Sequence, residues 1–107
     1  MENSERICGL LGLATRAGKV TFGTEACMSS IEKKKVNLLL IASDASERTK
    51  LKFENICSKY HVPVLEILTE EEISKAIGKE NKVVAGVEEV NFSKEILKIN
   101  NGGEVIG

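Results

Sequence analysis

Residues 38–42 read Leu-Leu-Leu-Ile-Ala, a continuous apolar run that lies between Asn37 and the polar pair Ser43-Asp44. At this length, and between polar flanks, such a run is typical of a strand that is buried on both faces. We therefore expect a central strand here. Asp44-Ala45-Ser46 then turns the chain, and Ser46 is a good N-cap for the helix that follows.

Working outward from this strand, helical and extended patterns alternate along the chain. Strands joined by helices of about ten residues need crossover connections, and right-handed crossovers place helices on both faces of a sheet. The predicted fold class is therefore α/β, a three-layer α/β/α sandwich with a mixed sheet of about four strands. Before the central strand we expect a helix with Ile7, Leu10, Leu11 and Ala14, capped by Asn3 or Ser4 and ended by Gly18, and then an extended piece over 19–22. A second helix opens at Gly23-Thr24 and has Cys27, Met28 and Ile31 on one face. In the second half of the chain we expect a strand over 64–68 that Pro63 starts, a short helix from a Thr69/Glu72 capping box through Ile77, a strand over 83–90, and a last helix that Asn91 caps.

Length and composition indicate one domain. The chain has 107 residues, 42% of them apolar, and we expect a single domain over 1–100 with a flexible tail over 101–107. No run of about 18 apolar residues is present, so we expect no membrane partner. The start is polar and acidic, unlike a secretory signal. Three cysteines without paired spacing favour reduced thiols and a cytoplasmic location.

Charge is unevenly distributed along the chain. The net charge is −1, yet residues 6–35 hold six Lys or Arg against two acids, and residues from 64 onward hold nine acids against five bases. A positive end on a nearly neutral domain is consistent with a local site for an anion. On charge alone, an ordinary solvated surface is the more frequent explanation.

Signatures of catalysis are weak. The chain has no G-x-G-x-x-G segment after a strand and no P-loop, and therefore no predicted phosphate cradle for a nucleotide cofactor. Cys57 and His61 are four residues apart on one expected helix, but a buried thiol beside a helix-end imidazole is the more frequent arrangement than a metal site. Asp44 follows the central strand, where a turn-stabilising aspartate is common. We predict no catalytic residue, no metal and no cofactor. These three residues motivate the third hypothesis, an enzyme or the detached substrate-binding domain of an RNA-modifying enzyme.

Gly23-Thr24-Glu25 is the most informative local pattern, because it opens a helix directly after a short extended piece. Free N–H groups and the positive end of the helix dipole suit phosphates or base edges there. Gly23 would let a ligand approach the backbone closely. Thr24 is either a helix cap or a ligand contact, and as an isolated pattern the plain cap is more frequent.

An ordered set of segments resembles the family of the archaeal large-subunit ribosomal protein that binds RNA kink-turns, and within it the small bacterial YlxQ-type members. The resemblance runs from about residue 15 to 87 and implies the α/β/α fold reached above by a separate route. The matching segments are Gly18-Lys19-Val20, Gly23-Thr24-Glu25, Leu38-Leu39-Leu40-Ile41-Ala42-Ser43-Asp44, Val62-Pro63-Val64 and Ser74-Lys75-Ala76-Ile77-Gly78-Lys79-Glu80.

The resemblance implies a structured RNA partner, ribosomal or otherwise kink-turn-like, and association with the ribosome. The helix that begins at Gly23-Thr24 would enter the widened groove of the kink, and the loop Gly78–Asn81 would lie beside a flipped-out nucleotide. The RNA-binding residues predicted on this basis are Lys19, Gly23, Thr24, Glu25, Ala26, Ser29, Lys33, Lys79, Glu80 and Asn81.

Four of these positions depart from the family pattern. Glu25, Ala26 and Ser29 replace an Asn-Glu pair and a lysine, and Asn81 replaces an apolar residue. The departures leave open whether the RNA is a kink-turn or another structured RNA. They also motivate the second hypothesis, a protein-interaction module on the same fold, for which the acidic second half of the chain is a further reason.

Overall fold

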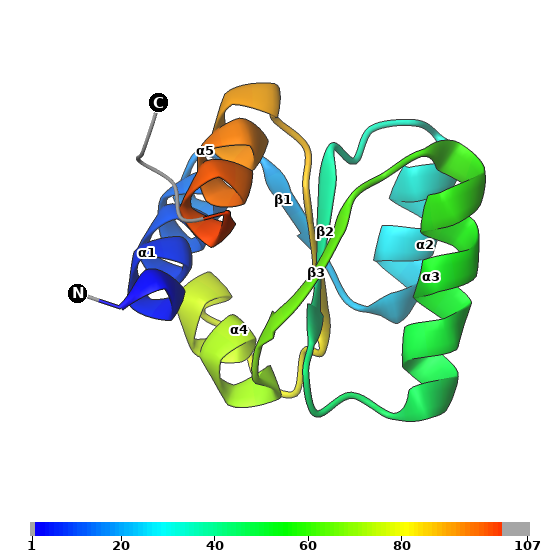
Figure 1. Cartoon of the computed structure of the whole chain (residues 1–107), viewed down its shortest axis with the longest axis horizontal. Coiled ribbons are helices and arrows are strands. Elements are labelled where there is room, and N and C mark those ends of the chain that lie inside the picture. The colour runs from blue at the N-terminus through cyan, green and yellow to red at the C-terminus, as the bar shows by residue number, and fades with distance from the viewer. Residues whose placement is uncertain (1, 102–107) are drawn as a thin grey trace.

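The computed structural model describes residues 2–101, and Figure 1 shows them as a sheet between two layers of helices. Along the chain the elements are α1 (Asn3–Arg16), β1 (Val20–Phe22), α2 (Thr24–Glu32), β2 (Leu38–Ala42), α3 (Glu47–Tyr60), β3 (Val64–Leu68), α4 (Glu70–Ile77), β4 (Val84–Val87) and α5 (Val90–Asn100). Helices α1, α4 and α5 cover one face of the sheet, and α2 and α3 cover the other (Figure 1). The predicted three-layer sandwich is confirmed.

The sheet is mixed and four strands wide, in the order β1-β4-β2-β3. β2 pairs with β3 in parallel, with Leu39 opposite Val64. β2 also pairs with β4 in the antiparallel direction, with Leu40 opposite Ala85, and β4 carries β1 on its other edge. Every residue of β2 and β4 is buried, because both strands have a neighbour on each side and helices above and below.

The core gathers around the two central strands. α1 buries Ile7 and Leu11 against one face, and α3 buries Phe53 on the other. These residues recur at helical spacing, which is why one stripe of each helix faces the sheet. Within residues 2–101 no helix is long and apolar enough to cross a membrane.

Two predicted helix starts are confirmed. The Ser46 hydroxyl accepts a hydrogen bond from the Thr49 N–H at 3.1 Å, so Ser46 is the N-cap of α3. The Thr69 hydroxyl accepts from the Glu72 N–H at 3.1 Å, while the Glu72 carboxylate accepts from the Thr69 N–H at 2.9 Å. This reciprocal pair is the predicted capping box of α4.

The first helix start was predicted wrongly. Glu2, not Asn3 or Ser4, is the N-cap of α1, and its N–H donates to the Glu5 carboxylate at 3.4 Å. Asn3 lies inside the helix, and its amide Nδ2 donates to the Ile99 carbonyl at 3.2 Å. Its side chain is therefore used to join α1 to α5.

The last strand and helix also differ from the prediction. β4 ends at Val87 rather than at residue 90, because Val87 is the last residue that pairs with both β1 and β2. α5 begins directly afterwards, and its N-cap is Glu89 rather than Asn91. The Glu89 carboxylate accepts from the Phe92 N–H at 2.7 Å. Of the predicted tail 101–107, only Asn101 lies within the described residues, and it is the C-cap of α5.

We expect opposite effects from alanine at two glycines. A Cβ at Gly86 would lie 3.0 Å from methyl carbons of both Thr21 and Val36, whereas a Cβ at Gly9 would meet nothing within 4 Å. Gly86→Ala should therefore destabilise the fold by about 1–3 kcal/mol through overpacking. Gly9→Ala, inside α1, should stabilise it by about 0.5–1 kcal/mol. Urea unfolding of both variants checks the pair, and equal effects would contradict this account of β4.

Glu89 should make the stability of the fold sensitive to acid. Hydrogen bonds from the Phe92 and Asn91 backbone lower the pKa of its carboxyl from the ordinary 4.5. A lowered folded pKa means that the stabilisation is fully present above the ordinary value and is lost as the pH falls through the folded one. Glu89→Gln should therefore unfold with a shallower dependence on pH below about 4.5. Thermal melts at pH 3–7 test this, and identical pH profiles would reject the role.

Candidate functional site

The start of α2 presents free backbone donors. Gly23 is the N-cap, with a positive φ of 92° that suits glycine, and its N–H donates to the Val84 carbonyl at 3.2 Å. The first hydrogen bond of the helix runs from the Cys27 N–H to the Gly23 carbonyl at 3.0 Å. Thr24 is the first helical residue rather than the cap, and no side chain caps the helix. The N–H groups of residues 24–26 therefore find no acceptor among residues 2–101.

Two lysines lie beside this helix start. Lys79 Nζ is 5.4 Å and Lys82 Nζ is 5.8 Å from the centre of the Phe22 ring. A Cβ at Gly23 would lie 3.9 Å from Lys82 Nζ. The loop after α4 thus lies against the start of α2. The helix start at Gly23-Thr24 and the loop Gly78–Asn81, which the sequence analysis predicted as two RNA contacts, therefore lie side by side. We call Phe22, Gly23, Lys79 and Lys82 the Phe22 cluster.

Ser74 holds the loop after α4 in place. Its side chain is buried, and the hydroxyl accepts from the Lys82 N–H at 2.9 Å and donates to the Lys82 carbonyl at 3.2 Å. Gly78 and Asn81 both adopt positive φ values, 75° and 58°, which turn the chain back on itself. The loop that carries Lys79 to Asn81 therefore has a fixed shape.

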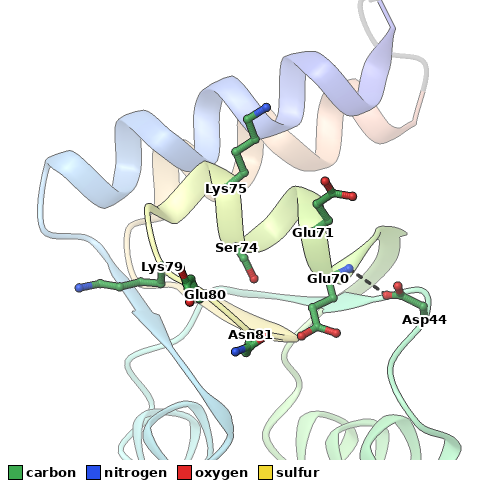
Figure 2. A pocket seen from close by; sticks show the side chains of 8 residues that line it. All are labelled: Asp44, Glu70, Glu71, Ser74, Lys75, Lys79, Glu80 and Asn81. Carbon is green, nitrogen blue, oxygen red and sulfur yellow. Dashed lines mark hydrogen bonds between the residues drawn. The ribbon is translucent and has the colours of Figure 1, made fainter.

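A hollow of about 610 Å³ opens beside this loop. Figure 2 shows Asp44 and Glu70 together on one side of it, while Lys79 extends away on the other. The Asp44 carboxylate accepts from the Glu70 N–H at 2.8 Å, so Asp44 ties the turn after β2 to the start of α4. The residues lining the hollow are Asp44, Glu70, Glu71, Ser74, Lys75, Lys79, Glu80 and Asn81.

A second, smaller hollow of about 230 Å³ runs along α2, and we call it the α2 groove. It contains Ala26, Ser29 and Lys33, three of the residues predicted from the sequence, but not Glu25. Ser30, which is buried, donates a hydrogen bond to Glu88 across the groove. The lining residues are Thr21, Ala26, Ser29, Ser30, Lys33, Lys35 and Glu88.

Lys19 is separated from the Phe22 cluster. It lies at the opposite end of β1, where its carbonyl accepts from the Glu88 N–H at 2.7 Å. Its positive charge also helps to lower the pKa of Glu89, after the larger effect of the Phe92 and Asn91 backbone hydrogen bonds. Sequence reasoning missed Phe22 and Lys82. Phe22 lay in the extended piece predicted over 19–22, and Lys82 directly follows the predicted loop Gly78–Asn81, but only the pairing of β1 with β4 places them together.

Two of the residues considered for catalysis, Cys57 and His61, lie in different surroundings. Cys57 is buried, and loss of solvent raises its thiol pKa to about 11. His61 is exposed at the C-cap of α3 in a left-handed conformation. Burial likewise raises the pKa of Cys27 to about 12. Within residues 2–101 no three metal-ligating side chains are gathered in one place.

Comparison with known proteins gives consistent matches. Residues 5–97 match the model of the ribosomal protein L7Ae/L30e/S12e/Gadd45 family. The RNA-binding protein YlxQ of Enterococcus faecium is 38% identical over 100 residues, which cover 94% of this chain and 96% of that protein. The protein of the same name from Bacillus subtilis (strain 168) is 33% identical over 90 residues, which cover 84% and 90% of the two chains.

Solved structures show the same fold. A Bacillus halodurans protein of unknown function has a TM-score of 0.85 and 33% identity, with 89% of this chain and 96% of that one covered. The Giardia lamblia 15.5kD RNA binding protein has a TM-score of 0.79, with 94% and 88% covered. Its identity is only 19%, so it is evidence for the fold alone.

The buried thiols should be unreactive in the folded chain. At pH 8 nearly all of Cys27 and Cys57 is protonated, because their pKa values are about 12 and 11, and the thiolate is the nucleophile. We expect both to react with a disulfide reagent only after denaturation. Mass spectrometry after brief labelling checks this, and rapid native labelling of Cys57 would reopen a catalytic role.

Proposed function

The chain belongs to the ribosomal protein L7Ae/L30e/S12e/Gadd45 family, and on that basis we propose that it binds structured RNA of the kink-turn kind. The observation that carries the proposal is the Phe22 cluster, where unpaired N–H groups at the start of α2 lie beside Lys79 and Lys82. The names of the YlxQ relatives, both RNA-binding proteins, support the same partner.

The Phe22 cluster has the chemistry of a phosphate or base-edge site. The positive end of the α2 dipole and its free N–H groups favour negative charge or acceptor atoms. Two lysine ammonium groups next to the helix start add point charges for the RNA backbone. Lys33, the C-cap at the other end of α2, would add a further positive charge, whereas Lys19 would make a separate phosphate contact at the far end of β1.

The larger hollow suits an unstacked base. Its volume of about 610 Å³ is ample for one nucleotide base, and it adjoins the loop of Lys79, Glu80 and Asn81. Carboxylates at Asp44 and Glu70 would accept from the amino group of a base, and Asn81 offers both donor and acceptor atoms. Recognition of a splayed base in an irregular RNA is the usual way proteins read RNA sequence.

Glu25 departs from the family pattern, and its place in the helix gives it a structural use. It is an acid in the first turn of α2, where it stabilises the positive end of the helix dipole. It does not line the α2 groove, whereas Ala26 and Ser29 do. We therefore propose that RNA contacts the side of α2 that carries Ala26, Ser29 and Lys33.

Ribosome association and a cytoplasmic location belong to the same proposal, because the family to which the chain belongs is one of ribosomal proteins. The proposal assigns the chain no reaction and no cofactor. A protein partner remains the competing function, and it would use the acidic residues that line the larger hollow, among them Glu70, Glu71 and Glu80.

The proposal is tested by binding to a labelled kink-turn RNA and to a matched duplex without the bulge, across a salt series. We expect a clear preference for the kinked RNA. Lys79→Ala/Lys82→Ala should weaken binding and reduce the salt slope by about 1.4–1.8, since each lost phosphate contact removes about 0.7–0.9.

The matched control is Lys94→Ala/Lys98→Ala. It removes the same charge from exposed positions of α5, on the opposite face of the sheet (Figure 1). The control should leave the slope nearly unchanged. Equal, weak binding of both RNAs by the wild type would reject the kink-turn proposal and favour the protein partner. Equal losses in the two double variants would mean that binding depends on net charge rather than on the Phe22 cluster.

A further inference from the structure

The α2 groove combines a carboxylate with two unpaired cations. Glu88 lies across the groove from Ser30, and Lys33 and Lys35 are both exposed at its lining. The ion pairs among the described residues both involve Lys50, so neither lysine of the groove is paired with Glu88. The Glu88 carboxylate lies in one groove with two lysines that do not pair with it. Such a groove suits a ligand that carries both a hydrogen-bond donor and negative charge.

The position of Glu88 is fixed from two directions. Its backbone N–H donates to the Lys19 carbonyl at 2.7 Å, which anchors the residue just beyond β4. Its carboxylate oxygen Oε2 accepts from the Ser30 hydroxyl. Ser30 is only 7% exposed, so this bond is built into the packing of α2 against the sheet.

Glu88 lines the α2 groove and has acceptor capacity that Ser30 does not use. An ionised carboxylate has about four lone-pair sites on two oxygens, and Ser30 occupies one of them. Within residues 2–101 the Ser30 bond is the only hydrogen bond to this carboxylate. A hydroxyl donor that entered the groove would therefore meet a carboxylate that Ser30 holds in place.

We propose that the α2 groove binds the ribose of an RNA backbone, with the Glu88 carboxylate accepting from a 2′-hydroxyl while Lys33 and Lys35 contact the flanking phosphates. The inference rests on the proposed RNA-binding function and adds a specificity determinant to it. The 2′-hydroxyl is the group that distinguishes RNA from DNA. With a strand that lacks the hydroxyl, the carboxylate would gain no hydrogen bond, while its negative charge would still oppose the nearby phosphates.

The test compares two probes: a kink-turn RNA, and the same sequence with 2′-deoxyribose throughout its bulged strand. The quantity measured is the ratio of the two Kd values for the full chain. The wild type should prefer the ribose form, and Glu88→Ala should lower that preference roughly ten- to hundredfold, the usual effect of losing one hydrogen bond to a charged group. Binding of the deoxy probe should become tighter in this variant, since a negative charge leaves the groove.

Two further variants serve as controls, one for the buried Ser30 hydroxyl and one for net charge. Glu88→Ala leaves the Ser30 hydroxyl buried without its partner, so Ser30→Ala/Glu88→Ala, which removes both groups, should fold more stably and show the same loss of preference. Glu95→Ala removes an equal charge from exposed α5, on the other face of the sheet, and should keep the wild-type ratio.

The outcomes separate this inference from the proposed function. A wild type that binds neither probe overturns both. A wild type that binds the kinked RNA but has the same Kd ratio as Glu88→Ala and the double variant overturns the ribose site alone. A Kd ratio that falls equally in Glu95→Ala also overturns it, because the effect would then come from net charge.

Discussion

The rest of the molecule depends on the complete burial of β2. All five of its residues are buried, so the backbone N–H and C=O groups of the strand need a neighbouring strand on each side. β3 and β4 supply those neighbours, and two layers of helices remove both faces from water. The need to cover both edges of β2 fixes β3, β2 and β4 as neighbours. The edge of β4 that faces away from β2 is then free to pair with β1. The candidate site forms at that outer edge.

Much of the fold could be predicted because local patterns agree with the tertiary structure. The apolar run at 38–42, the Ser46 cap and the Thr69/Glu72 box each depend on residues a few positions apart. The failures occurred where a distant contact decided the outcome. Asn3 is a good capping residue, but its side-chain amide donates to the distant Ile99 carbonyl instead. Glu89 replaced Asn91 because the strand pairing ends at Val87.

The candidate site was predictable as separate pieces but not as a surface. Gly23-Thr24 and the loop through Asn81 are visible in the sequence, since a helix start and a polar loop are local features. Their contact through Phe22 follows from β1 lying beside β4, two strands that are far apart along the chain. The same adjacency brings Glu88 across from Ser30. Sheet order cannot be read from residue spacing, so Lys82 and Glu88 had no signal of their own.

The loop that Ser74 clamps has a consequence for how any ligand must adapt. A buried hydroxyl bonded to both the N–H and the carbonyl of Lys82 leaves that segment little freedom to rearrange. The helix start that it touches is equally fixed by the sheet. Because this binding surface cannot rearrange, a ligand must change its own conformation to fit it. For the proposed RNA, affinity would then vary with how readily the nucleic acid bends, even at nucleotides that the protein never touches.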